Sequence, residues 1–273
     1  KGITNNLITL INKIRKDEKD KSNFLEEKII NVNSDLARQL DLDLSFLEED
    51  YNFLRLIINS SYLNLKDETK IVSMGETFTA KILNQYLLKY DHLTEFFDAV
   101  NFIKCNQKNL SLHNNGNFSV EKDIIIDRLN NRNMVVIPGF RGINSDEEIC
   151  LMGRGGSDTT GSIIASELQS IKYQIWTDVS GIYSGDPNNM KNVHIIESIS
   201  YDAAQEISAM GAKVIHPYCI QPCKKYNIPI EIRNTYNFDT KFTTIGNIDE
   251  LSEKTIYSIT NQEKNSIFKV ESL

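Results

Sequence analysis

Residues Gly153 to Asp158 combine a glycine-rich turn with one cation, one hydroxyl and one carboxylate. Glycines let backbone N–H groups approach an anion closely, and the planar guanidinium of Arg154 suits a carboxylate or a phosphate. Further along the chain, a short apolar segment ends in Thr177 and Asp178. A strand, a glycine loop, a helix and a second strand that ends in polar groups predict a phosphate or nucleotide site at the edge of a parallel sheet. The site is not a Walker loop, because no Gly-Lys-Ser/Thr follows the glycines.

Polar residues also follow other predicted strands. Ser73, Gly75 and Glu76 come after one apolar segment, and Gly139 and Arg141 come after another. Ligands of open α/β sheets bind outside the carboxyl ends of the strands, so we expect these groups to converge on the same crevice as the glycine loop.

Each candidate also has a structural explanation. Ser157 and Asp158 stand where a helix begins, and both residue types are common helix caps. Glu76 is as well explained by a carboxylate in the first turn of a helix, where the macrodipole favours it. Thr177–Asp178 can form an ordinary turn with Ser180–Gly181.

Two further residues have competing interpretations. Lys213 lies between a small residue and an apolar pair in Gly211–Pro217, where it can reach a phosphate or a ribose. Most single lysines are simply solvated, which is the alternative for this one. Trp176 ends an apolar segment. We expect it in the core rather than at a surface where it would stack on a base.

The elements that must position these residues alternate along the chain. Apolar spacing predicts helices over residues 4–65, 77–90, 124–129, 159–168, 200–210 and 218–225. Short apolar segments predict strands over 70–73, 98–103, 134–137, 148–151, 172–176 and 228–233, with a turn at 140–142. Strands separated by helices imply an α/β fold, a three-layer αβα sandwich with a mostly parallel sheet covered on both faces.

Composition excludes several classes of protein. The 273 residues are 40% hydrophobic and 25% charged, which suits a globular chain with a core. The net charge of −7 argues against general nucleic-acid binding. No apolar run is long enough to span a bilayer and no signal peptide opens the chain, so we expect a cytoplasmic protein. The four cysteines and four histidines are dispersed, which predicts free thiols and no metal site built from these residues.

The combined motifs resemble those of aspartokinases, members of the amino acid kinase superfamily. The resemblance covers about residues 1–248, in the family's order. The segments that carry it are Gly2–Asn5, Val72–Glu76, Pro138–Gly142, Met152–Thr160, Ile175–Pro187 and Gly211–Pro217.

The resemblance implies the amino acid kinase fold and the transfer of the ATP γ-phosphoryl group to the β-carboxylate of L-aspartate, the first step towards lysine, threonine and methionine. Aspartate would bind to Thr4, Glu76 and Arg154, with Arg154 on the α-carboxylate and Glu76 on the ammonium group.

The resemblance also implies roles around the phosphates and the nucleotide. Asp158 would organise phosphoryl transfer, together with Ser157 and the backbone of Gly155 and Gly156. ATP with Mg²⁺ is the expected cofactor, with the ion held partly by phosphates and no dedicated protein metal site. The residues expected to contact the nucleotide are Thr177, Asp178, Tyr183, Lys213 and Val214.

The sequence departs from the family in three places. The family opens with a strand and a Lys-Phe-Gly-Gly-Thr-Ser segment that contacts the phosphates, whereas this chain starts at Lys1; we expect further residues before it, and expect the chain as given to be inactive without them. The family's Asp-Pro-Arg is Asp186-Pro187-Asn188 here, which puts one nucleotide contact in doubt. The family's small residue after Ser-Asp-x-Thr is Gly161 here, a mild change.

Residues 249–273 resemble the start of an α+β ACT regulatory domain, after a kinase domain over 1–248. In the full-length protein this implies a homodimer inhibited by lysine or threonine. Two other functions are open. One is a sister kinase that acts on glutamate, acetylglutamate or a nucleoside monophosphate, and the other is a non-catalytic regulatory subunit that binds amino acids.

Overall fold

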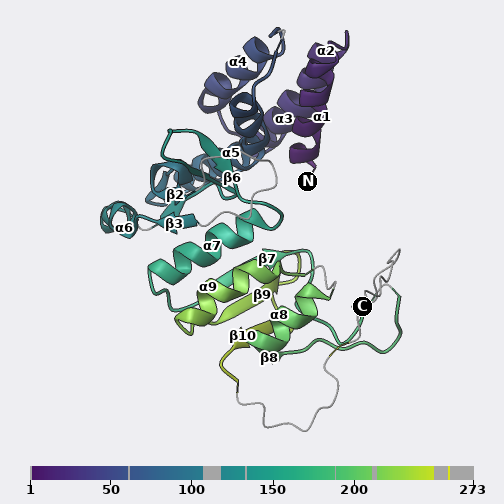
Figure 1. Cartoon of the computed structure of the whole chain (residues 1–273), viewed down its shortest axis with the longest axis vertical. Coiled ribbons are helices and arrows are strands. Elements are labelled where there is room, and N and C mark those ends of the chain that lie inside the picture. The colour runs from purple at the N-terminus through teal and green to yellow at the C-terminus, as the bar shows by residue number, and fades with distance from the viewer. Residues whose placement is uncertain are drawn as a thin grey trace, which may run out of the picture. The chain divides into compact units, whose positions relative to one another are not determined.

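The structure, a computed structural model, describes residues 2–60, 62–106, 118–132, 134–187, 189–210, 214–248 and 258. The chain divides into two units, residues 1–160 and 161–273, and each unit has its own core. The order of the elements along the chain can be followed by colour in Figure 1.

The first unit begins with a group of helices around one long helix, α5 (Leu65–Lys89). The others are α1 (Ile3–Arg15), α2 (Lys21–Leu25), the π-helical turn η1 (Glu26–Ile30), α3 (Asn31–Gln39), the 3₁₀ turn η2 (Ser45–Leu47) and α4 (Glu48–Ile57). Their apolar faces form one core, in which Leu7, Leu54 and Phe78 are fully buried.

Helix α5 replaces a predicted strand. The prediction of a strand over 70–73 that ends before Glu76 is wrong, because the helix runs unbroken through these residues. It begins at Asn64, whose side chain caps it by accepting a hydrogen bond from the N–H of Asp67 at 2.8 Å. The segment that resembled a strand is the part of α5 that is buried on nearly every side, so its apolar residues show no helical spacing.

Two sheets of the described residues belong to the first unit. Strands β1 (Thr94–Phe96) and β4 (Met134–Val136) form a parallel pair. The other sheet has the order β3-β2-β5-β6, formed by β3 (Phe118–Val120), β2 (Ile103–Cys105), β5 (Arg141–Ile143) and β6 (Ile149–Leu151). The 3₁₀ turn η3 (Ala99–Asn101) separates β1 from β2, and α6 (Lys122–Asn130) precedes β4.

Helix α7 (Gly156–Glu167) begins in the first unit and ends in the second. The second unit contains one described sheet with the order β7-β9-β10-β8, formed by β7 (Tyr173–Thr177), β9 (Ile230–Asn234), β10 (Thr243–Gly246) and β8 (Ser198–Ser200). Helices α8 (Tyr201–Ala209) and α9 (Ile220–Lys225), with the 3₁₀ turn η4 (Pro217–Cys219), pack on this sheet around a core rich in isoleucine (Figure 1).

The α/β fold class is confirmed, with sheets that are mixed. Among the described strands, four pairings are parallel and three are antiparallel. The predicted strand over 98–103 is wrong at its start, since η3 occupies 99–101 and β2 begins at Ile103. The predicted turn at 140–142 is also wrong, because β5 begins at Arg141.

Trp176 is not in the core. Its side chain is 46% exposed, because it lies on the face of β7 opposite the buried Ile175. Residues 249–257 and 259–273, where the start of an ACT domain is expected, lie outside the described residues, so that domain boundary stays a prediction.

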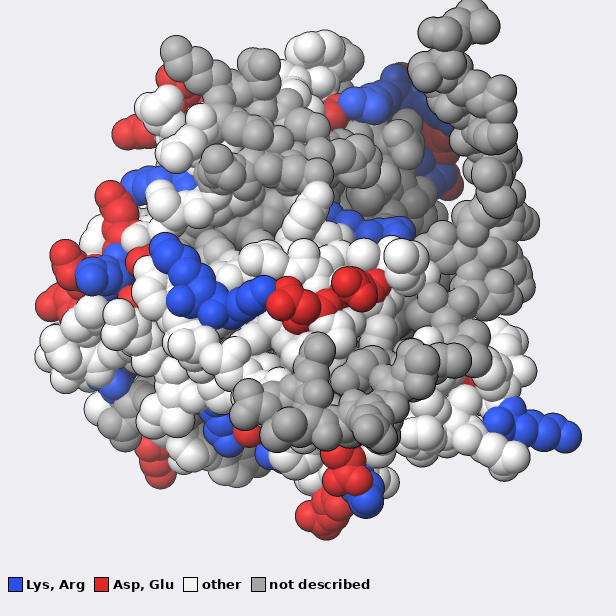
Figure 2. Space-filling model, turned by 60° about the horizontal axis from the view of Figure 1, so that its bottom comes forward, with Lys and Arg blue, Asp and Glu red and all other residues white. Residues whose placement is uncertain are grey.

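Charges are mixed over the surface. On the face shown in Figure 2, basic and acidic side chains of the described residues lie next to one another. Of the helices that the structure describes, none has the length and apolar character needed to cross a membrane.

Candidate functional site

The first contact of the site joins α1 to the middle of α5. A Cβ atom added to Gly75 would lie 3.3 Å from the Thr4 hydroxyl and 3.4 Å from the side chain of Ile3. The glycine therefore lets the first turn of α1 pack directly on α5. As a result, the Thr4 hydroxyl lies beside the turn of α5 that carries Glu76.

The second contact brings the start of α7 to the same region. A Cβ atom on Gly139 would lie 2.9 Å from the Cα of Ser157, so only glycine allows this approach. The Ser157 hydroxyl donates a hydrogen bond to the Glu76 carboxylate. Glu76 is thereby tied to the first turn of a helix that begins far away in the sequence.

The glycine loop itself sets where α7 starts. Gly155 has a left-handed φ of 73°, which glycine adopts without strain, and its carbonyl accepts the N–H of Thr159 at 2.9 Å. Gly156 packs against the ring of Phe140, where a Cβ would come within 2.5 Å of a ring carbon. Gly155 and Gly156 are thus required by geometry, whatever ligand the loop binds.

A buried threonine, which sequence analysis missed, locks the loop to its neighbour. The N–H of Phe140 donates to the Thr160 hydroxyl at 2.9 Å, and that hydroxyl donates to the Gly156 carbonyl at 2.8 Å. Phe140 has a left-handed φ of 73°, which costs a non-glycine residue about 1–3 kcal/mol. No pattern in the sequence marks Thr160 for this role, because its partner is 20 positions away.

Glu76 and Asp158 form a pair of half-buried carboxylates. Burial raises the pKa of Glu76 above its usual range, and the hydrogen bond from Ser157 partly opposes this. The pKa of Asp158 is raised by burial first and then by the charge of Glu76. Two carboxylates that disfavour each other's charge form a site that attracts a cationic group.

Arg154 differs from these residues in being exposed. It forms no ion pair or hydrogen bond with the part of the chain that the structure describes. Its guanidinium is therefore available to an anion in the loop that leads into α7, and the carboxylates and this cation together suit a ligand with both an ammonium and a carboxylate group.

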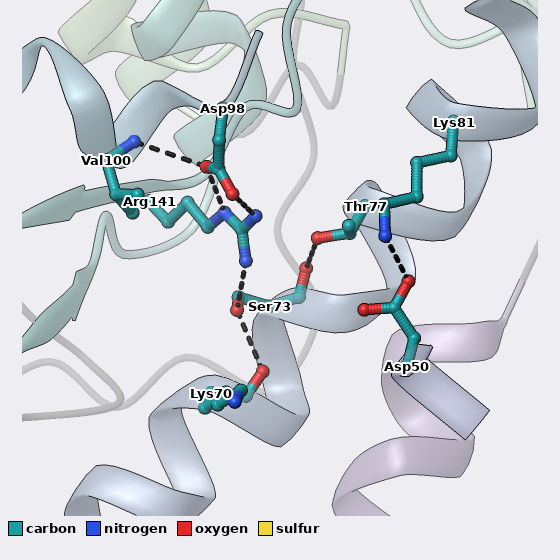
Figure 3. A network of polar contacts seen from close by, with 8 residues as sticks. All are labelled: Asp50, Lys70, Ser73, Thr77, Lys81, Asp98, Val100 and Arg141. Atoms are coloured by element: carbon teal, nitrogen blue, oxygen red, sulfur yellow. Dashed lines mark hydrogen bonds and ion pairs between the residues drawn. The ribbon is translucent and has the colours of Figure 1, made fainter. Parts of the chain in front are cut away.

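Arg141 does not join the crevice as expected. Its side chain is 5% exposed and forms a bidentate ion pair with Asp98, so it is an internal residue (Figure 3). Ser73 is also buried, inside α5. The structure thus brings Thr4, Glu76, Gly139, Ser157 and Asp158 together within the first unit, and it removes Ser73 and Arg141 from the candidate ligand contacts.

The candidate nucleotide residues belong to the second unit. Thr177 ends β7 and its hydroxyl donates to the Asp178 carboxylate at 3.2 Å, while its carbonyl accepts from the N–H of Thr235 at 2.7 Å. Tyr183 forms a bridge to Ile195, and its carbonyl accepts from the Ser258 hydroxyl at 2.9 Å. Val214 is half-buried against the core of this unit, and Lys213 lies outside the described residues.

Among the residues that the structure describes, no three histidine, cysteine, aspartate or glutamate side chains gather as a metal site would require. Glu76 and Asp158 are two carboxylates of the first unit that lie beside the glycine loop. One or two carboxylates are enough for Mg²⁺, provided that phosphates supply further ligands.

Comparison with known proteins gives one family. The model of the amino acid kinase family matches residues 2–234. Aspartokinase 2 of Bacillus subtilis (strain 168) is 32% identical over 168 residues, which cover 60% of this chain and 40% of that protein. A bifunctional aspartokinase/homoserine dehydrogenase of Buchnera aphidicola is 27% identical over 98% of this chain and 34% of its own length.

Similar solved structures are also aspartokinases. Aspartokinase III of E. coli in complex with aspartate and ADP superimposes with a TM-score of 0.80 at 25% identity, over 92% of this chain and 57% of that one. The same enzyme in complex with lysine and aspartate gives a TM-score of 0.77 over the same shares. This chain thus spans less than half of the length of the two curated relatives, and the predicted resemblance to aspartokinases is confirmed.

Proposed function

We propose that this chain, which belongs to the amino acid kinase family, transfers the γ-phosphoryl group of ATP to the β-carboxylate of L-aspartate. The observation that carries the proposal is that Ser157 and Asp158 interact with Glu76 in the first unit, while Thr4 packs on the adjacent Gly75. The E. coli enzyme that gives a TM-score of 0.80 was solved with aspartate and ADP, which supports the same pair of ligands here.

The substrate roles follow from charge. The ammonium group of aspartate pairs with Glu76, whose burial leaves it in need of a cation. Arg154 pairs with the α-carboxylate, since it is exposed and its fork accepts two oxygens. The Thr4 hydroxyl packs on Gly75, the residue before Glu76, and is assigned a further hydrogen bond to the substrate.

The phosphoryl site is assigned to the start of α7. The N–H groups of Gly155 and Gly156 face the developing negative charge, where the N-terminus of a helix favours anions, and the Ser157 hydroxyl supports the site by donating to Glu76. The β-carboxylate is ionised near pH 7, so its attack on phosphorus needs no general base. Catalysis then depends on holding two anions in line while nearby groups absorb their charge.

Asp158 acts as an orienting group and not as a proton acceptor. Its carboxylate fits Mg²⁺, which would be held mainly by the ATP phosphates and would neutralise the charge of the transferred group. The nucleotide is assigned to the second unit, through Thr177, Asp178, Tyr183, Lys213 and Val214.

The setting of the reaction is part of the proposal. The first step towards lysine, threonine and methionine takes place in the cytoplasm, and the protein acts as a homodimer. Lysine is the proposed inhibitor, since E. coli aspartokinase III was solved with lysine in its T-state. Threonine is the alternative inhibitor. Residues 249–273 are proposed as the start of the ACT-like domain that binds the inhibitor.

The test is the trapping of an acyl phosphate with hydroxylamine. The protein at its natural length is incubated with ATP, Mg²⁺ and hydroxylamine, together with L-aspartate, L-glutamate or N-acetyl-L-glutamate. We expect hydroxamate from aspartate and none from N-acetyl-L-glutamate, because Glu76 requires a free ammonium group; a larger yield from glutamate than from aspartate would identify a glutamate kinase. Hydroxamate from acetylglutamate would contradict the proposal and identify a sister kinase, and no hydroxamate from any acceptor would favour a binding protein.

A further inference from the structure

A buried arginine links the two elements that carry the proposed aspartate site. Arg141 stands at the start of β5, and its side chain reaches the face of α5 that lies one turn before Glu76 (Figure 3). The proposed reaction assigns this residue no contact with aspartate or the nucleotide. Burying a guanidinium is costly unless it is fully paired, so its presence in the interior calls for an explanation.

Each of the three guanidinium nitrogens of Arg141 has a hydrogen-bond partner within the first unit. Its Nε donates to Asp98 at 3.0 Å, and one of its terminal nitrogens donates to the other oxygen of the same carboxylate. Its remaining terminal nitrogen donates to the Ser73 hydroxyl at 3.1 Å. Asp98 is held in turn by the N–H of Val100 at 3.2 Å, as Figure 3 shows.

Ser73 connects this network to the substrate site. Its side chain is fully buried, and its hydroxyl donates to the Lys70 carbonyl at 2.8 Å while it accepts from Arg141. Residues three apart on a helix lie on adjacent turns of the same face, so Ser73 lies directly below Glu76 on α5. A shift of Ser73 along or around the helix axis moves Glu76 by a similar amount.

The backbone before Arg141 contacts the other half of the site. Phe140 is held to the Thr160 hydroxyl at 2.9 Å, and its carbonyl accepts the N–H of Met152 at 2.8 Å. Gly139 touches the Cα of Ser157. The segment from Gly139 to Arg141 therefore touches the first turn of α7 at one end and α5 at the other.

We propose that Arg141 is a positioning residue, which through Ser73 fixes Glu76 of α5 relative to Ser157 and Asp158 at the start of α7. This inference rests on the proposed function, because Glu76 is assigned there to the ammonium group of aspartate. An arginine suits the task better than a lysine, since its planar fork bonds Asp98 twice and still has a nitrogen for Ser73.

A second ion pair on the same helix provides a matched control. Lys81 donates to Asp50 at 2.5 Å and ties α5 to α4, with both side chains about equally buried (Figure 3). This pair stabilises α5 as Arg141 does, but it has no contact with Gly139, Ser73 or the start of α7 among the described contacts. If destabilising α5 were enough to weaken aspartate binding, disrupting either ion pair should weaken it equally.

The experiment compares Ser73→Ala and Arg141→Lys with Lys81→Met in the protein at its natural length. Isothermal titration measures the Kd of L-aspartate with a non-hydrolysable ATP analogue present, and separately the Kd of that analogue. Thermal unfolding of each variant shows that it is folded. Ser73→Ala is the conservative variant, since it removes one hydroxyl and leaves the Arg141–Asp98 pair intact.

We expect Ser73→Ala and Arg141→Lys to raise the Kd of aspartate about tenfold, or about 1.4 kcal/mol, and to leave the Kd of the analogue unchanged. Lys81→Met should lower the Tm without changing the Kd of aspartate. An unchanged Kd in Ser73→Ala, or an equal rise in Lys81→Met, would show that the network serves only stability. If the unmodified protein itself does not bind aspartate, the proposed function fails, and the positioning role fails with it.

Discussion

At the scale of single residues, the central feature of the site is Glu76, a carboxylate whose charged form is disfavoured by burial. Glu76 is the twelfth residue of a helix whose neighbouring turns are buried, and it accepts a hydrogen bond from the Ser157 hydroxyl, a neutral donor. A carboxylate in this setting is unstable without a cation. The substrate ammonium supplies that cation in the proposed reaction. The buried charge of Glu76 therefore both destabilises the free protein and favours binding of aspartate.

The first prediction concerns Glu76→Gln. The pKa of Glu76 in the folded protein is raised above the ordinary 4.5, so the folded state holds its proton more tightly than the unfolded state. Stability therefore falls as pH rises from 4.5 through the folded pKa, and the loss is complete above it. The amide should raise the Tm at pH 7.5, and this gain should disappear below pH 4.5.

The control for this prediction is Glu49→Gln, a change at an exposed glutamate in the first turn of α4. Thermal unfolding of both variants at pH 4 and at pH 7.5 gives the comparison, and Glu49→Gln should show no gain at either pH. A Glu76→Gln variant that is less stable than the unmodified protein at pH 7.5 would contradict the assigned cause of the shift.

The second prediction concerns Arg154→Ala. The residue is exposed and unpaired within the described part of the chain, so the substitution should leave the Tm unchanged. The KM for aspartate should rise by the equivalent of about 2–4 kcal/mol, the usual loss for a charge-assisted pair. Arg38→Ala, at an exposed arginine of α3 that pairs with Asp35, is the matched control. An unchanged KM would remove Arg154 from the substrate site.

At the scale of elements, the start of α7 depends on close packing. Gly155 turns the chain in the left-handed region, Gly156 lies against Phe140, and Gly139 lies against Ser157. Three glycines thus place one helix end within reach of Glu76. The sequence predicts the glycine loop and the helix after it, because both have local signals.

The third prediction concerns this packing. In Gly156→Ala, the new methyl group would lie 2.5 Å from the Phe140 ring and 2.9 Å from the Met152 side chain. Overpacking of this kind destabilises a protein by about 1–3 kcal/mol. Gly246→Ala in β10 is the control, since its methyl group would meet nothing within 4 Å, and it should change stability by less than about 0.5 kcal/mol. Equal effects in urea unfolding would show that the loop can relax.

Where sequence reasoning fails at this scale, the cause is tertiary contact. Ile71 and Val72 favour a strand by type, yet they form part of α5 because a core surrounds them. Arg141 resembles a ligand contact because it follows a strand and a glycine. Its actual partner, Asp98, lies 43 positions earlier, and no local signal joins the two.

At the scale of the whole molecule, the candidate residues fall into two groups along the chain. The candidate aspartate residues belong to residues 1–160, and the candidate nucleotide residues belong to residues 161–273. The alternation of strands and helices predicts the α/β class, since each element has its own period. The order and direction of the strands were not predictable in detail, because they depend on contacts between distant segments.

The proposed reaction is tested by identifying which carboxylate of aspartate is phosphorylated. The protein at its natural length is incubated with L-aspartate, ATP and Mg²⁺, and borohydride then reduces any acyl phosphate to the alcohol. We expect homoserine, detected by mass spectrometry, since transfer to the β-carboxylate leaves the α-carboxylate intact. 3-Amino-4-hydroxybutanoate, or the absence of any alcohol while ATP is bound, would contradict it.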